Sequence, residues 1–356
     1  MKILHTADLH LREYNDERWS TLRTVVEIAG KENVDFLIIS GDLFDSGIDA
    51  ENLRVKMRKV FSKMPFETVV IQGNHDVDSF QPGAHFGDNF TILSDPFKPI
   101  EREEVRIIGM PFESVDGKEV LSRILSLKKI MLDTKINILV YHGELLDAFF
   151  SREEFGEEGK ERHMPVKLSY FDESNVNYVL AGHFHTRFYV RQLKNGGYFV
   201  YPGSPISITK KETGQRKVDI FDLGNPPRDY LLDTPHFEAV HVTLNPFVKE
   251  DPVEIVKRKL EETHPAAKIL LTVDGYVNSA EINMTETQVI DEIKELTAGK
   301  LAEDPCLEIR DVKTILENSL FQSFLEKLKR LRYESEKDRV MRELAIRAMV
   351  SAKHED

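Results

Sequence analysis

The sequence has a single cysteine, Cys306, among its 356 residues. One thiol excludes an internal disulfide framework and fits a reducing compartment, so we expect a cytoplasmic protein. Long apolar runs are also missing, because no stretch approaches the ~20 residues that span a bilayer. Lys2, His5 and Asp8 interrupt the segment that would have to be a signal peptide. We therefore expect the N-terminus to form a strand, with neither export nor membrane insertion.

The chain also lacks an excess of positive charge. It has 61 acidic against 48 basic residues, a formal net charge of −13. Such a surface does not coat itself with nucleic acid through bulk charge, although a local basic face or bound metal cations can still hold phosphates. Composition therefore leaves the substrate open, while the length of the chain favours two domains over one core.

Residues of metal-ligand type follow five short apolar runs of strand character. The runs cover residues 2–7, 36–40, 68–72, 136–141 and 178–181. Strands bury apolar side chains and release the backbone into loops at their ends, so ligands at several strand ends of one sheet converge on one edge. We expect the active site at that edge.

The residues after these runs combine two carboxylates, one amide and four imidazoles: Asp8, Asp42, Asn74, His10, His142, His183 and His185. This mixed nitrogen and oxygen set suits Mn, Fe or Zn better than Mg or Ca, which prefer oxygen. The Asp42 carboxylate has two oxygens that can bridge a metal pair, so we predict a dinuclear site. Two metals about 3.5–4 Å apart would activate a bridging water and stabilise the phosphoryl oxygens of an in-line displacement.

His75 directly follows the predicted ligand Asn74, and we assign it a different role. Cleavage of a phosphodiester must protonate a departing alkoxide, and histidine has the unperturbed pKa that suits this task near neutrality. Asp45 could orient the imidazole of His75 and keep it protonated. Asp76 and Asp78 compete with Asp45 for this role.

Histidines outside these strand ends are interpreted as structural or surface residues. A lone histidine is more often one of these than a metal ligand. The residues in question are His5, His85, His163, His236, His241 and His264.

Strand-like and helix-like runs alternate from residue 1 to about 223, which predicts an α/β sandwich. An amphipathic helix over 52–64 is interpreted as packing on the sheet, with a dimer interface as the alternative. The mixed-charge run 153–162 is predicted to be a loop. Asn225-Pro-Pro227 interrupts regular structure and marks a domain boundary.

A small β-α-β-α unit is predicted after this boundary. Its signals are the N-cap Asp251 with Pro252 at the first helical position, and a capping box of Thr285 with Gln288.

Two amphipathic stripes follow from Leu316 onward. We expect them to expose apolar side chains that a partner helix or coiled coil would bury, with packing on the chain's own small domain as the alternative. The residues are Leu316, Leu320, Phe324, Leu328, Met341, Leu344 and Met349.

In order along the chain, the motifs resemble those of the calcineurin-like metallophosphoesterases. They are Asp8-Leu-His10, Gly41-Asp-Leu-Phe-Asp45, Gly73-Asn-His-Asp76, His142 and Gly182-His-Phe-His185. The resemblance implies a four-layer α/β/β/α sandwich with two metals. It implies Asp8, His10 and His185 on one metal, Asn74, His142 and His183 on the other, and Asp42 as the bridge. His75 with Asp45 resembles the aspartate–histidine dyad of the superfamily.

A narrower resemblance is to the SbcD-type DNA double-strand-break repair nucleases. It rests on Ile3-Leu-His-Thr-Ala-Asp-Leu-His-Leu11, Gly41-Asp-Leu-Phe-Asp45 and Tyr201-Pro-Gly-Ser-Pro205. It implies a phosphoesterase (nuclease) domain over 1–224, a small α+β capping domain over 236–300 and a helical partner-binding segment over 311–356. It also implies a manganese-dependent exonuclease and endonuclease, a homodimer, and a coiled-coil ABC-type ATPase of the SbcC type as partner.

Our leading hypothesis from the sequence is therefore a metal-dependent DNA nuclease that acts in double-strand-break repair. A phosphodiesterase on a small nucleotide-like substrate is the second hypothesis, because the same metals cleave any accessible diester. A metal-poor scaffold that only binds partners is the third, and the intact ligand set argues against it.

Overall fold

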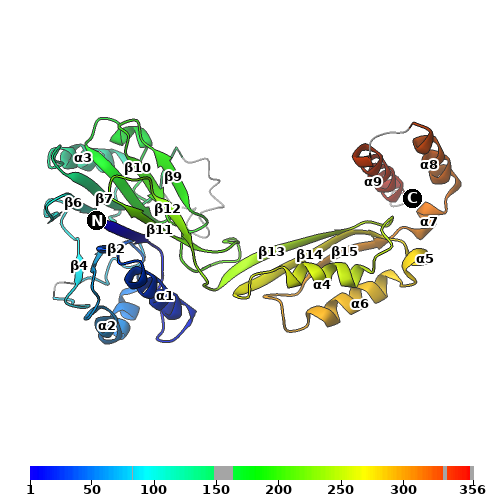
Figure 1. Ribbon diagram of the computed structural model, residues 1–356, viewed down its shortest axis with the longest axis horizontal. Helices are drawn as coiled ribbons and strands as arrows, with labels where there is room; N and C mark the ends of the chain where they lie inside the picture. The colour runs from blue at the N-terminus through cyan, green and yellow to red at the C-terminus, as the bar shows by residue number, and fades with distance from the viewer. Residues whose placement is uncertain (82, 148–162, 332–334, 353–356) are drawn as a thin grey trace. The chain divides into compact units, whose positions relative to one another are not determined.

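The computed structural model describes residues 1–81, 83–147, 163–331 and 335–352 (Figure 1). The predicted loop over 153–162 lies outside these residues. The chain divides into two compact units, Met1–Phe237 and Glu238–Asp356. The finer division into 1–224, 236–300 and 311–356 stays a prediction.

The first unit contains two six-stranded sheets. The first sheet has the order β12-β11-β1-β2-β3-β4 and consists of β1 (Lys2–Thr6), β2 (Phe36–Ser40), β3 (Glu67–Ile71), β4 (Phe90–Ile92), β11 (Lys217–Asp222) and β12 (Arg228–Leu231). The second has the order β5-β6-β7-β8-β10-β9 and consists of β5 (Ile100–Glu101), β6 (Val105–Met110), β7 (Ile136–His142), β8 (Val176–Gly182), β9 (Tyr189–Gln192) and β10 (Tyr198–Tyr201).

The central strands of each sheet are parallel. In the first sheet β1, β2, β3 and β4 pair in parallel, and in the second β6, β7, β8 and β10 do so. Parallel strands end at the same edge of a sheet, and the loops that carry polar groups gather there. The alternation of strand-like and helix-like runs thus leads to the predicted convergence of strand ends.

Three apolar cores show that these elements form four layers. Because neighbouring side chains in a strand point to opposite faces, Ile3 faces the second sheet while Leu4 faces outward. One core lies between the sheets, one lies beneath α1 (Glu17–Lys31) and α2 (Gly47–Phe61), and one lies beneath α3 (Gly117–Lys128) and the short 3-10 helix η2 (Leu168–Phe171). Figure 1 shows α1 and α2 on one side of the sheets and α3 on the other. The predicted α/β/β/α sandwich is confirmed.

Helix α2 begins five residues before the predicted helix and packs as expected. Leu53, Met57 and Phe61 are buried in the core of the first sheet. The interpretation of this stripe as a sheet-packing face is therefore confirmed.

The second unit is built on a three-stranded sheet of order β13-β14-β15. Its strands are β13 (His236–Leu244), β14 (Ala267–Val277) and β15 (Cys306–Asp311), and its helices are α4 (Pro252–Glu261), α5 (Ser279–Ile282) and α6 (Glu286–Thr297). The α4 and α6 helices share one apolar core with the sheet. The N-cap at Asp251 and the capping box of Thr285 with Gln288 are both confirmed. β15 was not predicted.

The C-terminal helices α7 (Lys313–Leu316), α8 (Ser319–Leu331) and α9 (Ser335–Ala352) are partly covered by their own unit. Phe247 and Tyr276 pack into the same apolar cluster as Leu316 and Ile346. The expectation that Leu316 and Leu328 are exposed was therefore wrong, whereas Leu320 and Leu344 are 69% and 58% exposed. Within the described residues, none of the helices combines the length and apolar character needed to cross a membrane.

The close approach of the two sheets generates a prediction about Gly109 in β6. A Cβ there would lie 2.4 Å from Leu93 Cβ and 3.1 Å from Ile71 Cγ2, so Gly109→Ala should lower the free energy of unfolding by roughly 1–3 kcal/mol. Gly30 in α1 is the matched control, because nothing lies within 4 Å of a Cβ at that position. Gly30→Ala should stabilise the protein by about 0.5–1 kcal/mol. Urea unfolding of both variants measures the difference, and equal effects would contradict the close approach.

Candidate metal centre

All seven predicted ligands lie at the carboxyl ends of strands from both sheets. Asp8 and His10 follow β1, Asp42 follows β2, and Asn74 follows β3. In the second sheet, His142 ends β7, while His183 and His185 follow β8. Six of the seven side chains are buried, and Asn74 is half-buried.

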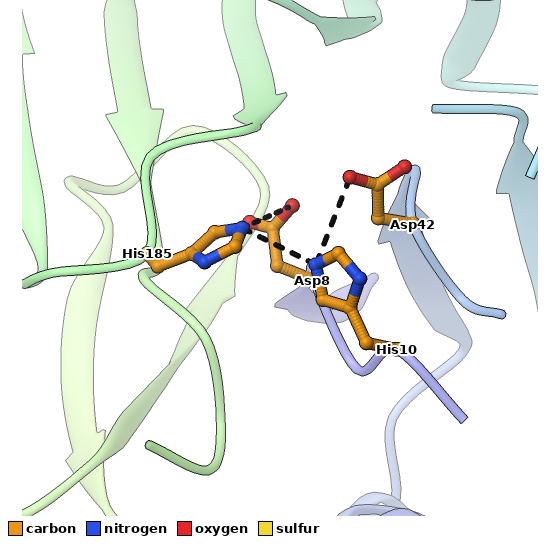
Figure 2. A group of neighbouring side chains, drawn as sticks. All are labelled: Asp8, His10, Asp42 and His185. Carbon is orange, nitrogen blue, oxygen red and sulfur yellow. Dashed lines mark hydrogen bonds and ion pairs between the residues drawn. The ribbon is translucent and has the colours of Figure 1, made fainter. Parts of the chain in front are cut away.

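One group of coordinating atoms is formed by Asp8, His10, Asp42 and His185, and Figure 2 shows these side chains turned toward one another. His10 Nε2 lies 3.2 Å from His185 Nε2 and 3.7 Å from Asp42 Oδ2. His185 Nε2 lies 3.8 Å from Asp8 Oδ1. One atom from each residue falls within 4.8 Å of the others, which is the spacing expected of ligands around a single cation.

A second group is centred on Asn74. Its Oδ1 lies 2.9 Å from His142 Nε2 and 3.2 Å from His183 Nδ1. The same His142 Nε2 is 3.4 Å from Asp42 Oδ2. Asp42 is therefore within reach of both groups.

The surroundings of Asp42 test whether a metal pair fits. Its Oδ1 accepts a hydrogen bond from the backbone N–H of His75 at 2.9 Å. Its Oδ2 is buried and has no hydrogen-bond partner among the residues that the structure describes. A buried carboxylate oxygen without a donor needs an explanation, and coordination of an ion supplies one. The residues present fit two divalent cations that share Asp42.

The backbone reaches this arrangement through left-handed conformations. Asp8, His10, Asp42 and His183 have φ angles of 56°, 48°, 49° and 102°. Such conformations cost on the order of 1–3 kcal/mol each and persist only where the surrounding structure enforces them. Backbone hydrogen bonds between the loops provide that enforcement, because Asp8 N–H donates to Gly41 O at 3.1 Å and His10 N–H to Asp42 O at 2.9 Å.

The buried carboxylates create a field that favours cations. Burial alone would lower the pKa of His142, but Asp42 and Asp8 outweigh it and raise this pKa to about 10. Burial would raise the pKa of Asp42, yet His142, His10 and His75 hold it well below its usual range. The pocket therefore retains protons on imidazole that a divalent cation would displace.

The predicted dyad residues lie next to the first group. The ring centroid of His75, an exposed residue, is 4.7 Å from that of His10. Asp45 contacts His10 Nδ1 at 3.5 Å, Arg12 Nε at 2.8 Å and Arg18 Nη1 at 3.4 Å. Coordinating atoms of His10, Asp45 and His75 fall within 4.8 Å of one another. Asp45 is close enough to act on His75, and its role as orienting residue stays a prediction.

Asp76, which we considered as a competitor of Asp45, has a different environment. Its carboxylate is buried and accepts hydrogen bonds from the backbone N–H groups of Leu43 and Gly73. Burial and the charge of Asp42 raise the pKa of Asp76 to about 7. Asp76 thus ties the loop after β2 to the loop after β3.

Three further residues contact the ligands and were not predicted. The backbone oxygen of Ser40 accepts a hydrogen bond from His142 Nδ1 at 2.8 Å, and Glu212 Oε1 lies 3.4 Å from His185 Nδ1. His163, interpreted above as structural or surface, packs its ring on that of His183 with a centroid distance of 5.0 Å. These contacts come from tertiary structure. Ser40 ends the run 36–40 and contributes through its backbone, while Glu212 and His163 lie outside the five strand-like runs.

Comparison with known proteins places this site in a family. Residues 1–187, more than half of the chain, match the model of the calcineurin-like phosphoesterases. The chain belongs to this family of phosphoester hydrolases, and its buried aspartate and histidine cluster is compatible with a binuclear divalent metal site.

Individual relatives are similar at low identity. The chain is 26% identical over 315 residues to the DNA double-strand break repair protein Mre11 of Sulfurisphaera tokodaii, which covers 81% of this chain and 77% of that protein. It is 26% identical over 270 residues to the protein of the same name from Saccharolobus solfataricus. This match covers 69% of this chain and 65% of that protein. It is 23% identical over 260 residues to the uncharacterized metallophosphoesterase YhaO of Bacillus subtilis. This match covers 66% of this chain and 60% of that protein.

Proposed function

We propose that this chain is a metal-dependent DNA nuclease of the SbcD type that acts in double-strand-break repair. The observation that carries the proposal is Asp42 Oδ2, a buried oxygen set between His10 and His142. Two of the three relatives above are named DNA double-strand break repair proteins, which supports DNA as the substrate.

Each predicted ligand has a place in this proposal. Asp8, His10 and His185 would hold one metal, Asn74, His142 and His183 the other, and Asp42 both. The mixed donor set suits manganese, iron or zinc, and the resemblance to the SbcD-type nucleases favours manganese among them. When bound, the two ions supply a hydroxide nucleophile at neutral pH and charge stabilisation of the phosphoryl oxygens.

His75 would then act on the leaving group. Its ring is exposed beside His10, so it is accessible to a substrate held at the first group. Its backbone N–H donates to Asp42 Oδ1, and its imidazole would transfer a proton to the departing oxygen. Asp45 would hold that imidazole in orientation.

The same chemistry is compatible with a small nucleotide-like diester as substrate. The net charge of −13 favours this second candidate, because bulk charge does not attract DNA. We further propose a homodimer in the cytoplasm, and an SbcC-type ATPase that contacts the C-terminal helices at Leu320 and Leu344. Both leucines are exposed in helices that are otherwise anchored on their own unit.

The ligand assignment predicts the loss of metal and activity together. Asp8→Ala and His183→Ala should each lower the Mn²⁺ content below two per chain and abolish Mn²⁺-dependent DNA degradation, since each removes a donor from a two-metal site. His85→Ala is the matched control, because His85 is an exposed imidazole outside both groups. Elemental analysis and cleavage of labelled DNA are the measurements. If the parent protein binds no metal after reconstitution, the proposal of a metal-dependent enzyme is wrong. If it cleaves small diesters but not DNA, the second candidate function is favoured.

His75→Ser separates proton transfer from metal binding. The variant should retain both metals and lose DNA cleavage by roughly 10²–10⁴-fold, because only the general acid is removed. Metal content by elemental analysis and single-turnover rates are compared with the parent. A missing metal in this variant would reassign His75 as a ligand.

The partner surface is tested on α8 by point substitution, because deleting 311–356 would also uncover Phe247 and Tyr276. Leu320→Glu should abolish co-purification with an SbcC-type ATPase and leave Mn²⁺-dependent cleavage of small diesters unchanged, since a charge replaces a 69% exposed apolar side chain. Lys329→Glu introduces the same carboxylate at an exposed position nine residues further along the helix, on its opposite side. It changes the net charge by −2 against −1 in Leu320→Glu, so it is the more stringent control for charge. Equal ATPase binding by both variants would disprove the assignment of Leu320.

A further inference from the structure

The carboxylate of Glu212 is built into the wall of the candidate metal centre. Glu212 lies between β10 and β11 and is only 2% exposed. Its Oε2 accepts hydrogen bonds from Ile208 N–H at 2.7 Å and Ser204 Oγ at 3.2 Å. Its Oε1 accepts from Thr209 N–H at 3.2 Å and also lies 3.4 Å from His185 Nδ1. Every donor around this carboxylate thus holds it in one orientation toward the His185 ring.

His185 presents its other ring nitrogen to the first group of ligands. Nε2 lies 3.2 Å from His10 Nε2 and 3.8 Å from Asp8 Oδ1. Dashed lines in Figure 2 mark these contacts. An ionised carboxylate only accepts hydrogen bonds, so the nitrogen that faces Glu212 must carry the ring proton. The donors Ile208 N–H, Ser204 Oγ and Thr209 N–H all bind this carboxylate, and hydrogen bonds of this number favour its ionised form.

The main chain around His185 is fixed by Arg216, which is also buried. Its Nε donates to Ser204 O at 2.9 Å and its Nη1 to Thr186 O at 3.0 Å, while its Nη2 donates to His185 O. Ring and backbone of His185 are therefore held by two separate sets of contacts. Glu212 controls the ring and Arg216 the backbone.

The imidazole of His142 in the second group has a weaker partner. Its Nδ1 faces the neutral backbone oxygen of Ser40 at 2.8 Å instead of a carboxylate. A carboxylate partner makes a metal-bound imidazole more basic than a carbonyl partner does. The first group also has Asp8 where the second has the neutral amide of Asn74. The two metal positions therefore differ in negative charge.

We propose that Glu212 is a positioning residue that fixes the Nδ1-protonated tautomer of His185 and makes the Asp8, His10 and His185 position the tighter of the two metal positions. The inference rests on the proposed metal centre and adds an order of affinity to it. Glu212 touches neither substrate nor metal in this scheme, and it acts through the ring of His185.

Calorimetric titration of the full chain with Mn²⁺ is the first test. The parent should show two binding events of different affinity, and Glu212→Gln should weaken the tighter one by about 10–100-fold and leave the weaker one unchanged. Ser207→Ala is the matched control, because Ser207 Oγ donates to the backbone oxygen of Glu212 at 2.6 Å and does not hold the carboxylate. This control should bind as the parent does.

The tautomer is measured independently on the metal-free protein by ¹⁵N NMR of the histidine rings, with His185 assigned through His185→Gln. The parent should show a proton on Nδ1 of His185, and Glu212→Gln should show a mixture of tautomers. Glu212→Asp keeps the charge but shortens the side chain, so it should lose affinity as Glu212→Gln does. This second variant also covers the case in which the glutamine variant fails to fold.

Four outcomes would overturn the inference. Unchanged affinity in Glu212→Gln, an equal loss at both metal positions, or an equal loss in Ser207→Ala would each reject a specific role for the carboxylate. Full Mn²⁺ affinity in Glu212→Asp would show that the charge alone is sufficient and that the position of the carboxylate is not required. In all four the parent binds two metals, so the proposed function stands. A parent that binds no Mn²⁺ overturns the proposed metal centre and the inference with it.

Discussion

The metal centre depends on the close approach between the two sheets at the end of β2. Ser40 Oγ donates a hydrogen bond across the sheets to Leu180 O in β8 at 2.9 Å. A Cβ at Gly182 would lie only 2.0 Å from Ser40 O, so no other residue fits there without separating the sheets. The same Ser40 oxygen accepts from His142 Nδ1. One backbone carbonyl thus sets the spacing of the sheets and the orientation of a ligand.

Two further glycines leave room for ligand side chains. A Cβ at Gly41 would lie 2.2 Å from His142 Nδ1, and one at Gly73 would lie 2.1 Å from Asp42 Oδ1. The sequence places these glycines directly before the predicted ligands Asp42 and Asn74. The structure supplies the reason. His142 from the second sheet occupies the volume that a side chain at Gly41 would need, and Asp42 from the same sheet occupies that volume at Gly73.

The sequence predicted the residues whose signal is local and missed those whose role depends on contacts between distant segments. Asp8, Asp42 and His142 were predictable because each sits within two residues of a strand end. Glu212 was not, because it meets His185 only after the segment between β10 and β11 folds back. The exposure of Leu316 was wrongly expected because its cover, Phe247 and Tyr276, comes from distant parts of the chain. β15 was missed because only two apolar residues, Leu307 and Ile309, mark its core-facing side.

The layer between the sheets shows how this strained edge is supported. His5 is buried with its Nε2 2.8 Å from Ser40 Oγ, and burial lowers the pKa of His5 to about 3. Asp219 Oδ2 on β11 lies 3.7 Å from His5 Nδ1, and burial raises the pKa of Asp219 well above its usual range. A neutral pair of this kind adds polarity next to Ser40 without a net charge that would compete with the ligands for a cation. The two ligand carboxylates, Asp8 and Asp42, lie instead in the loops after β1 and β2, where the backbone is left-handed.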